Sequence, residues 1–155
     1  MNIDAGTSSL CDYFKTRPGL LVTDSFTNRI LLKVSPLQLH SCERVIGKTL
    51  PRDMADTEII NEILGGVGKV HKYAPTLEHI KEMISLQWGG EDGELLNNGR
   101  TNIFYVLVGK VIFSLYVHRD LWRNKWDVDG WPLDKYARHG VGRRVFVCTS
   151  RVNRS

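Results

Sequence analysis

The segment from Thr101 to His118 constrains the fold more than any other part of the chain. Two runs rich in β-branched and aromatic residues flank Gly109-Lys110, and a two-residue loop with glycine in first position is typical of a tight β-hairpin. Pairing of Val108 with Val111 then sets which side chains share a face. One face holds Phe104, Val106, Val108, Val111, Phe113, Leu115 and Val117, and the other holds Ile103, Tyr105, Leu107, Ile112, Ser114, Tyr116 and His118. We expect the first face to be core and the second to be either covered by an amphipathic helix or partly open for binding.

Two helices are predicted between the N-terminal third and this hairpin. Apolar residues recur at helical spacing over 54–64 and over 76–88, and each run is followed by a glycine pair of the kind that ends helices. The second run has the clearer division into an apolar and a charged side. Both are therefore expected to pack an apolar stripe on a sheet.

Further strands are predicted on both sides of the helices. Residues 20–34 contain two apolar runs around a polar bend, which predicts a second hairpin, and residues 143–149 alternate as a last strand. With the 102–118 hairpin these segments predict an α+β fold. Its antiparallel sheet would have about five strands, with the two helices packed on one face.

The chain has the size and composition of one domain. Its 155 residues are 42% hydrophobic and 25% charged, which is ordinary for a soluble globular domain. Residues 1–17 are small, polar and uneven in pattern, so we expect a loosely held N-terminal arm. Residues 18–155 are expected to form the single α+β domain.

The three cysteines, Cys11, Cys42 and Cys148, are odd in number and far apart. This predicts no disulfide framework, a reducing compartment and therefore a cytoplasmic location. His40 and Cys42 could offer two metal ligands, but no second pair follows at zinc-site spacing, so neither a metal nor a cofactor is expected. The absence of a signal-like start and of about 18 consecutive apolar residues predicts a soluble protein without a membrane partner.

An aromatic-basic segment, residues 119–139, is the predicted binding surface, because it holds three of the four tryptophans among arginines and lysines. Large amphipathic rings beside cations are typical of binding hot spots and base-stacking surfaces. The residues expected to bind are Arg119, Trp122, Arg123, Lys125, Tyr136 and Arg138.

The tryptophans of this segment are not expected to be equivalent. Asp129-Gly130 predicts a turn that would pair Trp126 with Leu133. Trp126 and Trp131 would then be core, and Trp122 would be the freest of the three.

Two alternatives use the same region. A ribonuclease could use His118 and His139 as base and acid, with Arg143 or Arg144 stabilising the phosphorane-like charge, although solvated surface groups are the favoured interpretation. The net charge of +4 also suits a nucleic-acid-binding protein. Trp122 would stack on a base, and the cations facing phosphates would be Arg119, Arg123, Lys125, Arg138, Arg143, Arg144, Arg151 and Arg154.

Two resemblances bear on function. A hairpin, two helices and an antiparallel strand set ending in a basic strand resemble the layout of ribonuclease toxins of the RelE and barnase type. The runs 125–134 and 142–146 are similar to the endings of small bacteriophage accessory proteins, which implies a viral or mobile-element protein that binds host machinery in the host cytoplasm. We therefore expect a non-catalytic binding protein with a macromolecular partner, a host protein in preference to a nucleic acid.

Overall fold

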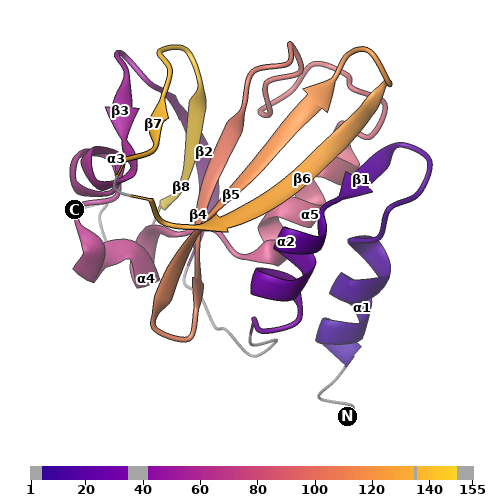
Figure 1. Ribbon diagram of the computed structural model, residues 1–155, viewed down its shortest axis with the longest axis horizontal. Coiled ribbons are helices and arrows are strands. Elements are labelled where there is room, and N and C mark those ends of the chain that lie inside the picture. The colour runs from indigo at the N-terminus through magenta and orange to yellow at the C-terminus, as the bar shows by residue number, and fades with distance from the viewer. Residues whose placement is uncertain (1–4, 35–41, 135, 150–155) are drawn as a thin grey trace.

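A six-stranded mixed sheet forms the centre of the molecule (Figure 1). The computed structural model describes residues 5–34, 42–134 and 136–149. The strands lie in the order β1 (Leu20–Val22), β6 (Lys125–Pro132), β5 (Val111–Asp120), β4 (Asn102–Val108), β8 (Arg144–Thr149) and β2 (Arg44–Thr49). A second, two-stranded sheet pairs β3 (Met54–Ala55) with β7 (Arg138–His139).

The helices confirm both predicted helical segments and add others. The described helical elements are α1 (Ala5–Tyr13), α2 (Asp24–Phe26), a π-helical turn (Thr27–Leu31), α3 (Asp56–Glu62), a 3-10 turn (Val67–Lys69), α4 (Val70–Tyr73) and α5 (Leu77–Leu86). Thr76 caps α5 by accepting a hydrogen bond from the backbone N–H of His79, which is the usual function of a threonine before the first helical residue.

The β4–β5 hairpin has the predicted register, with Val108 opposite Val111. Both of its faces are core. Phe104, Val106 and Leu115 pack with α5 and α1, whereas Ile103 and Tyr105 pack with α3 and α4. The helices predicted for one face therefore lie on opposite faces, because apolar residues occupy both sides of β4 and each side must be covered. Figure 1 shows α3 and α4 to the left of the sheet and α1 and α5 to its right.

The α+β class of the prediction is confirmed, but the sheet is not purely antiparallel. β1 pairs with β6 in parallel, and so does β4 with β8. The remaining pairs of the large sheet are antiparallel.

The prediction of a hairpin at 20–34 is wrong beyond its first strand. Residues 24–31 are helical, and Thr23 caps them by accepting a hydrogen bond from the N–H of Phe26. Phe26 and Ile30 are four residues apart and fully buried, which is the helical spacing. The apolar run 30–34 was misleading because short apolar runs do not distinguish strand from helix.

The predicted turn at Asp129-Gly130 is also wrong, because β6 runs straight through it. Glycine is needed at position 130 for close packing and not for a turn. A side chain there would bring its Cβ to 2.6 Å from Cδ1 of Ile30 and 3.3 Å from Cα of Phe26. Glycine thus allows the helical segment after β1 to approach the strand closely.

The expected loose arm is anchored in the core from Leu10 onward. Residues 5–13 form α1, and Leu10 and Phe14 are buried beside Phe26 and α5. Burial of these apolar side chains holds the segment against the body. The first four residues lie outside the described part of the chain.

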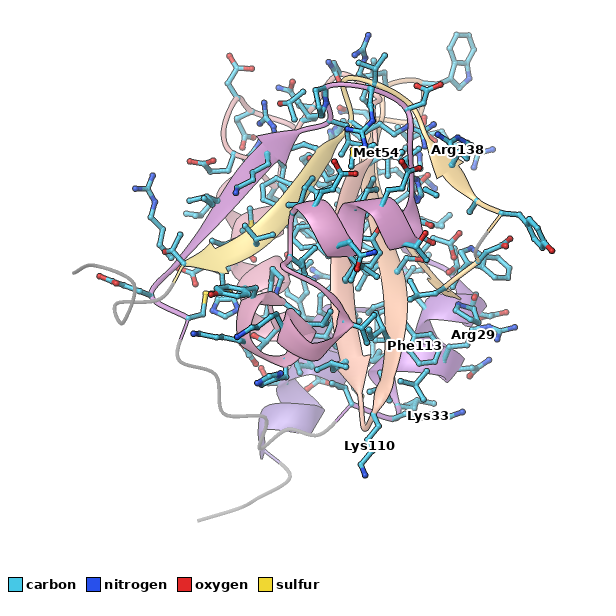
Figure 2. All side chains as sticks on the ribbon, turned by 90° about the vertical axis from the view of Figure 1, so that its left-hand side faces the viewer. Arg29, Lys33, Met54, Lys110, Phe113 and Arg138 are labelled. Atoms are coloured by element: carbon cyan, nitrogen blue, oxygen red, sulfur yellow. A yellow bond between two sulfur atoms is a disulfide. The ribbon has the colours of Figure 1, made fainter. Side chains whose placement is uncertain are left out.

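The prediction of unpaired cysteines is wrong, because Cys42 and Cys148 form a disulfide (Figure 2). The two residues are 106 positions apart, and pairing of β2 with β8 brings them together. Cys11 is free. The inference of a reducing compartment from unpaired cysteines therefore loses its basis.

Replacing Phe104 by alanine tests the two-faced hairpin. Phe104 is fully buried and stacks on Phe146 with ring centroids 4.8 Å apart. We expect Phe104→Ala to lower the free energy of unfolding by about 3–5 kcal/mol, because it leaves a cavity in the core. Phe113 shares its face but is only half-buried, so Phe113→Ala should cost clearly less in the same urea titration. Equal losses would contradict the burial described for this face.

Candidate functional site

The connection between β5 and β6, residues 121–124, is an ordered turn that we call the hairpin tip. One oxygen of the Asp120 carboxylate accepts hydrogen bonds from the backbone N–H groups of Trp122 and Arg123, at 3.1 and 3.0 Å. Asn124 has a φ of +56°, a left-handed conformation that asparagine tolerates better than most residues. These features hold the backbone of the tip in one conformation. Figure 1 shows this connection at the upper right.

Arg119 anchors the base of the hairpin tip and is not a surface cation, contrary to the prediction. Only 3% of it is exposed. Its guanidinium donates to the carbonyls of Trp88 and Gly89 and to Oδ1 of Asn124, and it lies 5.4 Å from the ring centre of Trp126. A buried guanidinium needs such partners, because burying an unsatisfied charge is costly.

The side chains of residues 121–123 are exposed. Trp122 is 95% exposed and Leu121 is 66% exposed, and Arg123 beside them is also exposed. Trp126 is fully buried, whereas Trp131 is 46% exposed. Trp126 is therefore core as expected, the expectation of a core position for Trp131 is wrong, and Trp122 is the freest of the three.

The rest of the predicted binding set does not lie at the tip. Lys125 begins β6 and is half-buried, while Tyr136 and Arg138 follow the far end of this strand. The eight residues of β6 span about 26 Å. Tyr136 and Arg138 therefore lie at the other end of this strand from the tip and Lys125. Arg138 forms an ion pair with Glu58 at 3.3 Å, and Figure 2 shows it near Met54. The predicted segment is thus divided between two parts of the surface.

A buried polar cluster lies where β3 and β7 meet α3. It consists of Asp56, Tyr105 and His139, which we call the Asp56 cluster. Asp56 is 1% exposed and His139 is 4% exposed. Oδ1 of Asp56 accepts from the Tyr105 hydroxyl at 2.6 Å and lies 2.7 Å from Nε2 of His139. Burial and the neighbouring carboxylate both raise the pKa of Tyr105, so this hydroxyl stays a donor.

A groove of about 710 Å³ borders the Asp56 cluster. Its wall includes Asp56, Tyr116, Trp131, Asp134 and Tyr136. The indole N–H of Trp131 donates to Asp129 at 2.7 Å, which fixes the ring at the groove. Spacing along the sequence did not predict this site as one group, although Tyr136 and His139 were candidates, because Asp56, Tyr105 and Tyr116 come from distant segments.

The residues of the ribonuclease alternative come together only in part. His118 pairs with Asp127 at 3.2 Å, and Tyr116 on the same face of β5 lies 5.6 Å from the His139 ring. Burial raises the pKa of Tyr116 above its ordinary value, and the positive charge of Arg143 opposes part of this increase.

Arg144 does not join the other residues of the ribonuclease set. Neighbouring residues of a strand point to opposite faces, so Arg144 lies on the other side from Val145 and donates to the carbonyl of Glu94 at 2.6 Å.

One group of side chains in the described ranges has ligand atoms close enough for a metal ion. The atoms belong to Cys42, His79 and Cys148 and lie within 4.8 Å of one another. His40, the other possible ligand beside Cys42 in the sequence, lies outside the described residues. Sequence spacing could not indicate the observed group, because its members come from three distant segments.

The chain matches no family model, no curated protein and no solved structure. None of the helices in the described ranges is long and apolar enough to cross a bilayer. A proposal about function therefore rests on the sequence and on the geometry of the described residues.

Tyr105→Phe tests the Asp56 cluster. It removes a donor to a buried carboxylate, and we expect the free energy of unfolding in urea to fall by about 1–3 kcal/mol. Tyr116→Phe is the matched control, because Tyr116 is only half-buried and its change should cost less. A Tyr105→Phe variant as stable as the wild type would contradict the arrangement of the cluster.

The order of the hairpin tip should depend on the ionisation of Asp120. The N–H groups of Arg123 and Trp122 lower the pKa of Asp120 below its ordinary value of 3.8. Because the pKa of Asp120 is lower in the folded than in the unfolded state, the ionised carboxylate stabilises the tip fully at pH values above the unfolded-state pKa. This stabilisation is lost as the pH falls through the folded-state pKa. The amide NMR signals of Trp122 and Arg123 should therefore titrate with a midpoint below 3.8, and Asp120→Asn should abolish this titration. A midpoint at or above the ordinary value would contradict the hydrogen bonds of the tip.

Proposed function

We propose that the protein is a non-catalytic binding protein and that the hairpin tip is its main contact with another protein. The observation that carries this proposal is the 95% exposure of Trp122 on a backbone fixed by Asp120. Tryptophan is the side chain most enriched at the energetic centres of interfaces.

The apolar character of the tip extends beyond one ring. Leu121 is also exposed, so two adjacent large apolar side chains face solvent with Arg123 beside them. This combination of apolar area and a cation is typical of protein interfaces, where aromatic residues and arginine are enriched.

The rigidity of the tip favours binding. Association costs free energy when a loop must become ordered. Here Asp120, Asn124 and Arg119 already fix the turn, so a partner can bury Trp122 with little loss of backbone entropy.

A protein partner is favoured over a nucleic acid, because the predicted cations do not form one surface. Arg119 is buried, Arg138 is paired with Glu58, and Arg144 is bonded to a carbonyl on another face. Phosphate binding would need several free cations along one path. Arg151 and Arg154 lie outside the described residues.

The geometry also favours binding over ribonuclease activity. His139 is 4% exposed, with its Nε2 held by Asp56. A general acid or base must reach the substrate's proton. His118 is more accessible than His139. The ribonuclease alternative requires two accessible imidazoles, one as base and one as acid, and His139 does not meet this requirement.

The resemblance of residues 125–134 and 142–146 to phage accessory proteins supports a proposal about origin and location. We infer that the partner is a host protein and that the chain acts in the host cytoplasm, where it could inhibit its target. A reducing cytoplasm keeps cysteine pairs as thiols, so Cys42 and Cys148 would be reduced there.

Trp122→Ala tests the proposal. We expect binding to the partner to weaken by about 2 kcal/mol, or roughly thirtyfold in Kd, because a hot-spot ring is lost. The melting temperature should not change, since the ring is exposed. The measurement is capture of interacting proteins from nuclease-treated lysate of the source cell, followed by titration of the protein that the wild type retains.

Two further variants make this test specific. Leu32→Ala removes another exposed apolar side chain, which is 62% exposed. It follows the helical turn Thr27–Leu31, whose Ile30 lies beside Gly130 of β6, and this variant should bind as the wild type does. Trp131→Ala removes the ring at the groove. Loss of binding in Trp131→Ala but not in Trp122→Ala would place the contact in the groove, and loss of capture on nuclease treatment would favour a nucleic acid.

A further inference from the structure

Strand β2 (Arg44–Thr49) forms one edge of the large sheet. It stands last in the strand order and pairs with β8 on one side, and no described strand pairs with its other side. Figure 2 shows β2 with β8 beside it at the margin of the sheet. The N–H of Leu50 donates to the Arg143 carbonyl across this pair, and successive residues of a strand point their backbone groups alternately to its two sides. The outer edge therefore presents the N–H and C=O groups of Val45, Gly47 and Thr49.

A groove of about 560 Å³ lies beside this edge. Strand β2 contributes Arg44, Ile46 and Lys48 to it, because alternate residues of a strand share a face. Its apolar wall is formed by Ile46, Ile63, Leu64 and Val147. A strand added to the edge would place every second side chain on this face, next to the side chains of β2 that line the groove.

The two cations of the groove lack a counter-charge. Arg44 and Lys48 are exposed, and neither forms an ion pair with another described residue. The acidic residue in the wall is Glu62, whose carboxylate pairs with Arg52 at 2.6 Å. Because Arg44 and Lys48 are four residues apart, they are separated by about 13 Å along the strand, with Ile46 between them. The face therefore presents a cation, an apolar side chain and a second cation at every second residue.

These charges oppose pairing of two copies of the chain through β2. In the antiparallel register centred on Ile46, Arg44 of each copy would lie opposite Lys48 of the other, and like charges directly opposite each other destabilise a strand pair. An extended acidic peptide has the opposite property, since its carboxylates would face the same two cations. Charge complementarity therefore favours such a peptide over a second copy as the occupant of the edge.

We propose that β2 binds an extended acidic segment of another protein as an added antiparallel strand. Backbone hydrogen bonds to the outer edge of β2 supply affinity, and alternate side chains of the segment supply specificity, as in other complexes formed by strand addition. The segment has an acidic residue opposite Arg44 and another opposite Lys48, with an apolar residue opposite Ile46 at the groove. This surface is separate from the hairpin tip, because β5 and β6 lie on the other side of β4 in the strand order.

Fluorescence anisotropy of the full chain with a fluorescein-labelled peptide, Thr-Glu-Thr-Leu-Thr-Glu-Thr, tests the site. The wild type should bind this peptide, and Arg44→Glu/Lys48→Glu should bind it at least about tenfold more weakly, because two attractive pairs become repulsive. A peptide with lysine in place of both glutamates should bind the double variant better than the wild type. Lys33→Glu/Lys110→Glu is the matched control and should bind as the wild type does, since it changes the net charge equally at exposed residues that Figure 2 shows away from β2.

Methylation of the peptide backbone tests strand addition itself. In the antiparallel register the two threonines that flank the leucine donate their N–H groups to β2, whereas the N–H of the leucine points away from it. N-methylation of both threonines should therefore abolish binding, and N-methylation of the leucine should leave most of the affinity.

Several outcomes would overturn the proposal. These are a wild type that does not bind the acidic peptide, an equal loss of affinity in Lys33→Glu/Lys110→Glu, a folded Arg44→Glu/Lys48→Glu variant that does not bind the lysine peptide, or equal binding of the two N-methylated peptides. A wild type that binds no peptide and sediments as a dimer would assign the edge to a second copy instead. Trp122→Ala should bind the acidic peptide normally, so failure of this site and failure of the hairpin tip as a contact are separate results.

Discussion

Strand β4 is apolar on both faces, and the architecture depends on this property. Phe104 and Val106 require cover on one side and Ile103 and Tyr105 on the other, so a two-layer arrangement with one exposed face would leave core residues in water. Helices α3 and α4 cover one face and α1 and α5 the other. The strands on either side of β4 meet the same requirement. Apolar residues of β5 and β8 continue both apolar faces of β4 across the sheet.

The hairpin tip depends on this core through Arg119. Its guanidinium connects the end of α5, by way of the Trp88 and Gly89 carbonyls, to Asn124 in the tip. Gly90 makes this contact possible, since a Cβ there would lie 2.6 Å from Nε of Arg119. Arg119 thus connects the packed core to the ordered turn at the hairpin tip. Trp122 is exposed because the turn holds it outward, and the sheet and helices pack without it.

Local sequence signals predicted the parts of the fold that depend on local chemistry. The register of β4 and β5 followed from Gly109-Lys110, and α3 and α5 followed from helical spacing. Contacts between distant segments were not predictable. Gly130 resembled a turn residue, although it is needed for the approach of Ile30. Arg119 resembled a surface cation, although distant carbonyls bury it. For the site, the freedom of Trp122 was foreseen. The Asp56 cluster joins side chains of α3, β4 and β7, and the groove also needs Tyr116 of β5 and Trp131 of β6.

The central claim is that Trp122 is exposed on an ordered turn and is covered when a partner binds. Oxidative labelling of the four tryptophans, read by mass spectrometry on the free protein and on its complex, tests this claim most directly. In the free protein Trp122 should react fastest, followed by Trp131, and Trp126 should be protected, in the order of their exposure. In the complex the labelling of Trp122 should fall sharply while that of Trp131 stays the same. Equal labelling of Trp122 in the free and bound protein would contradict the account.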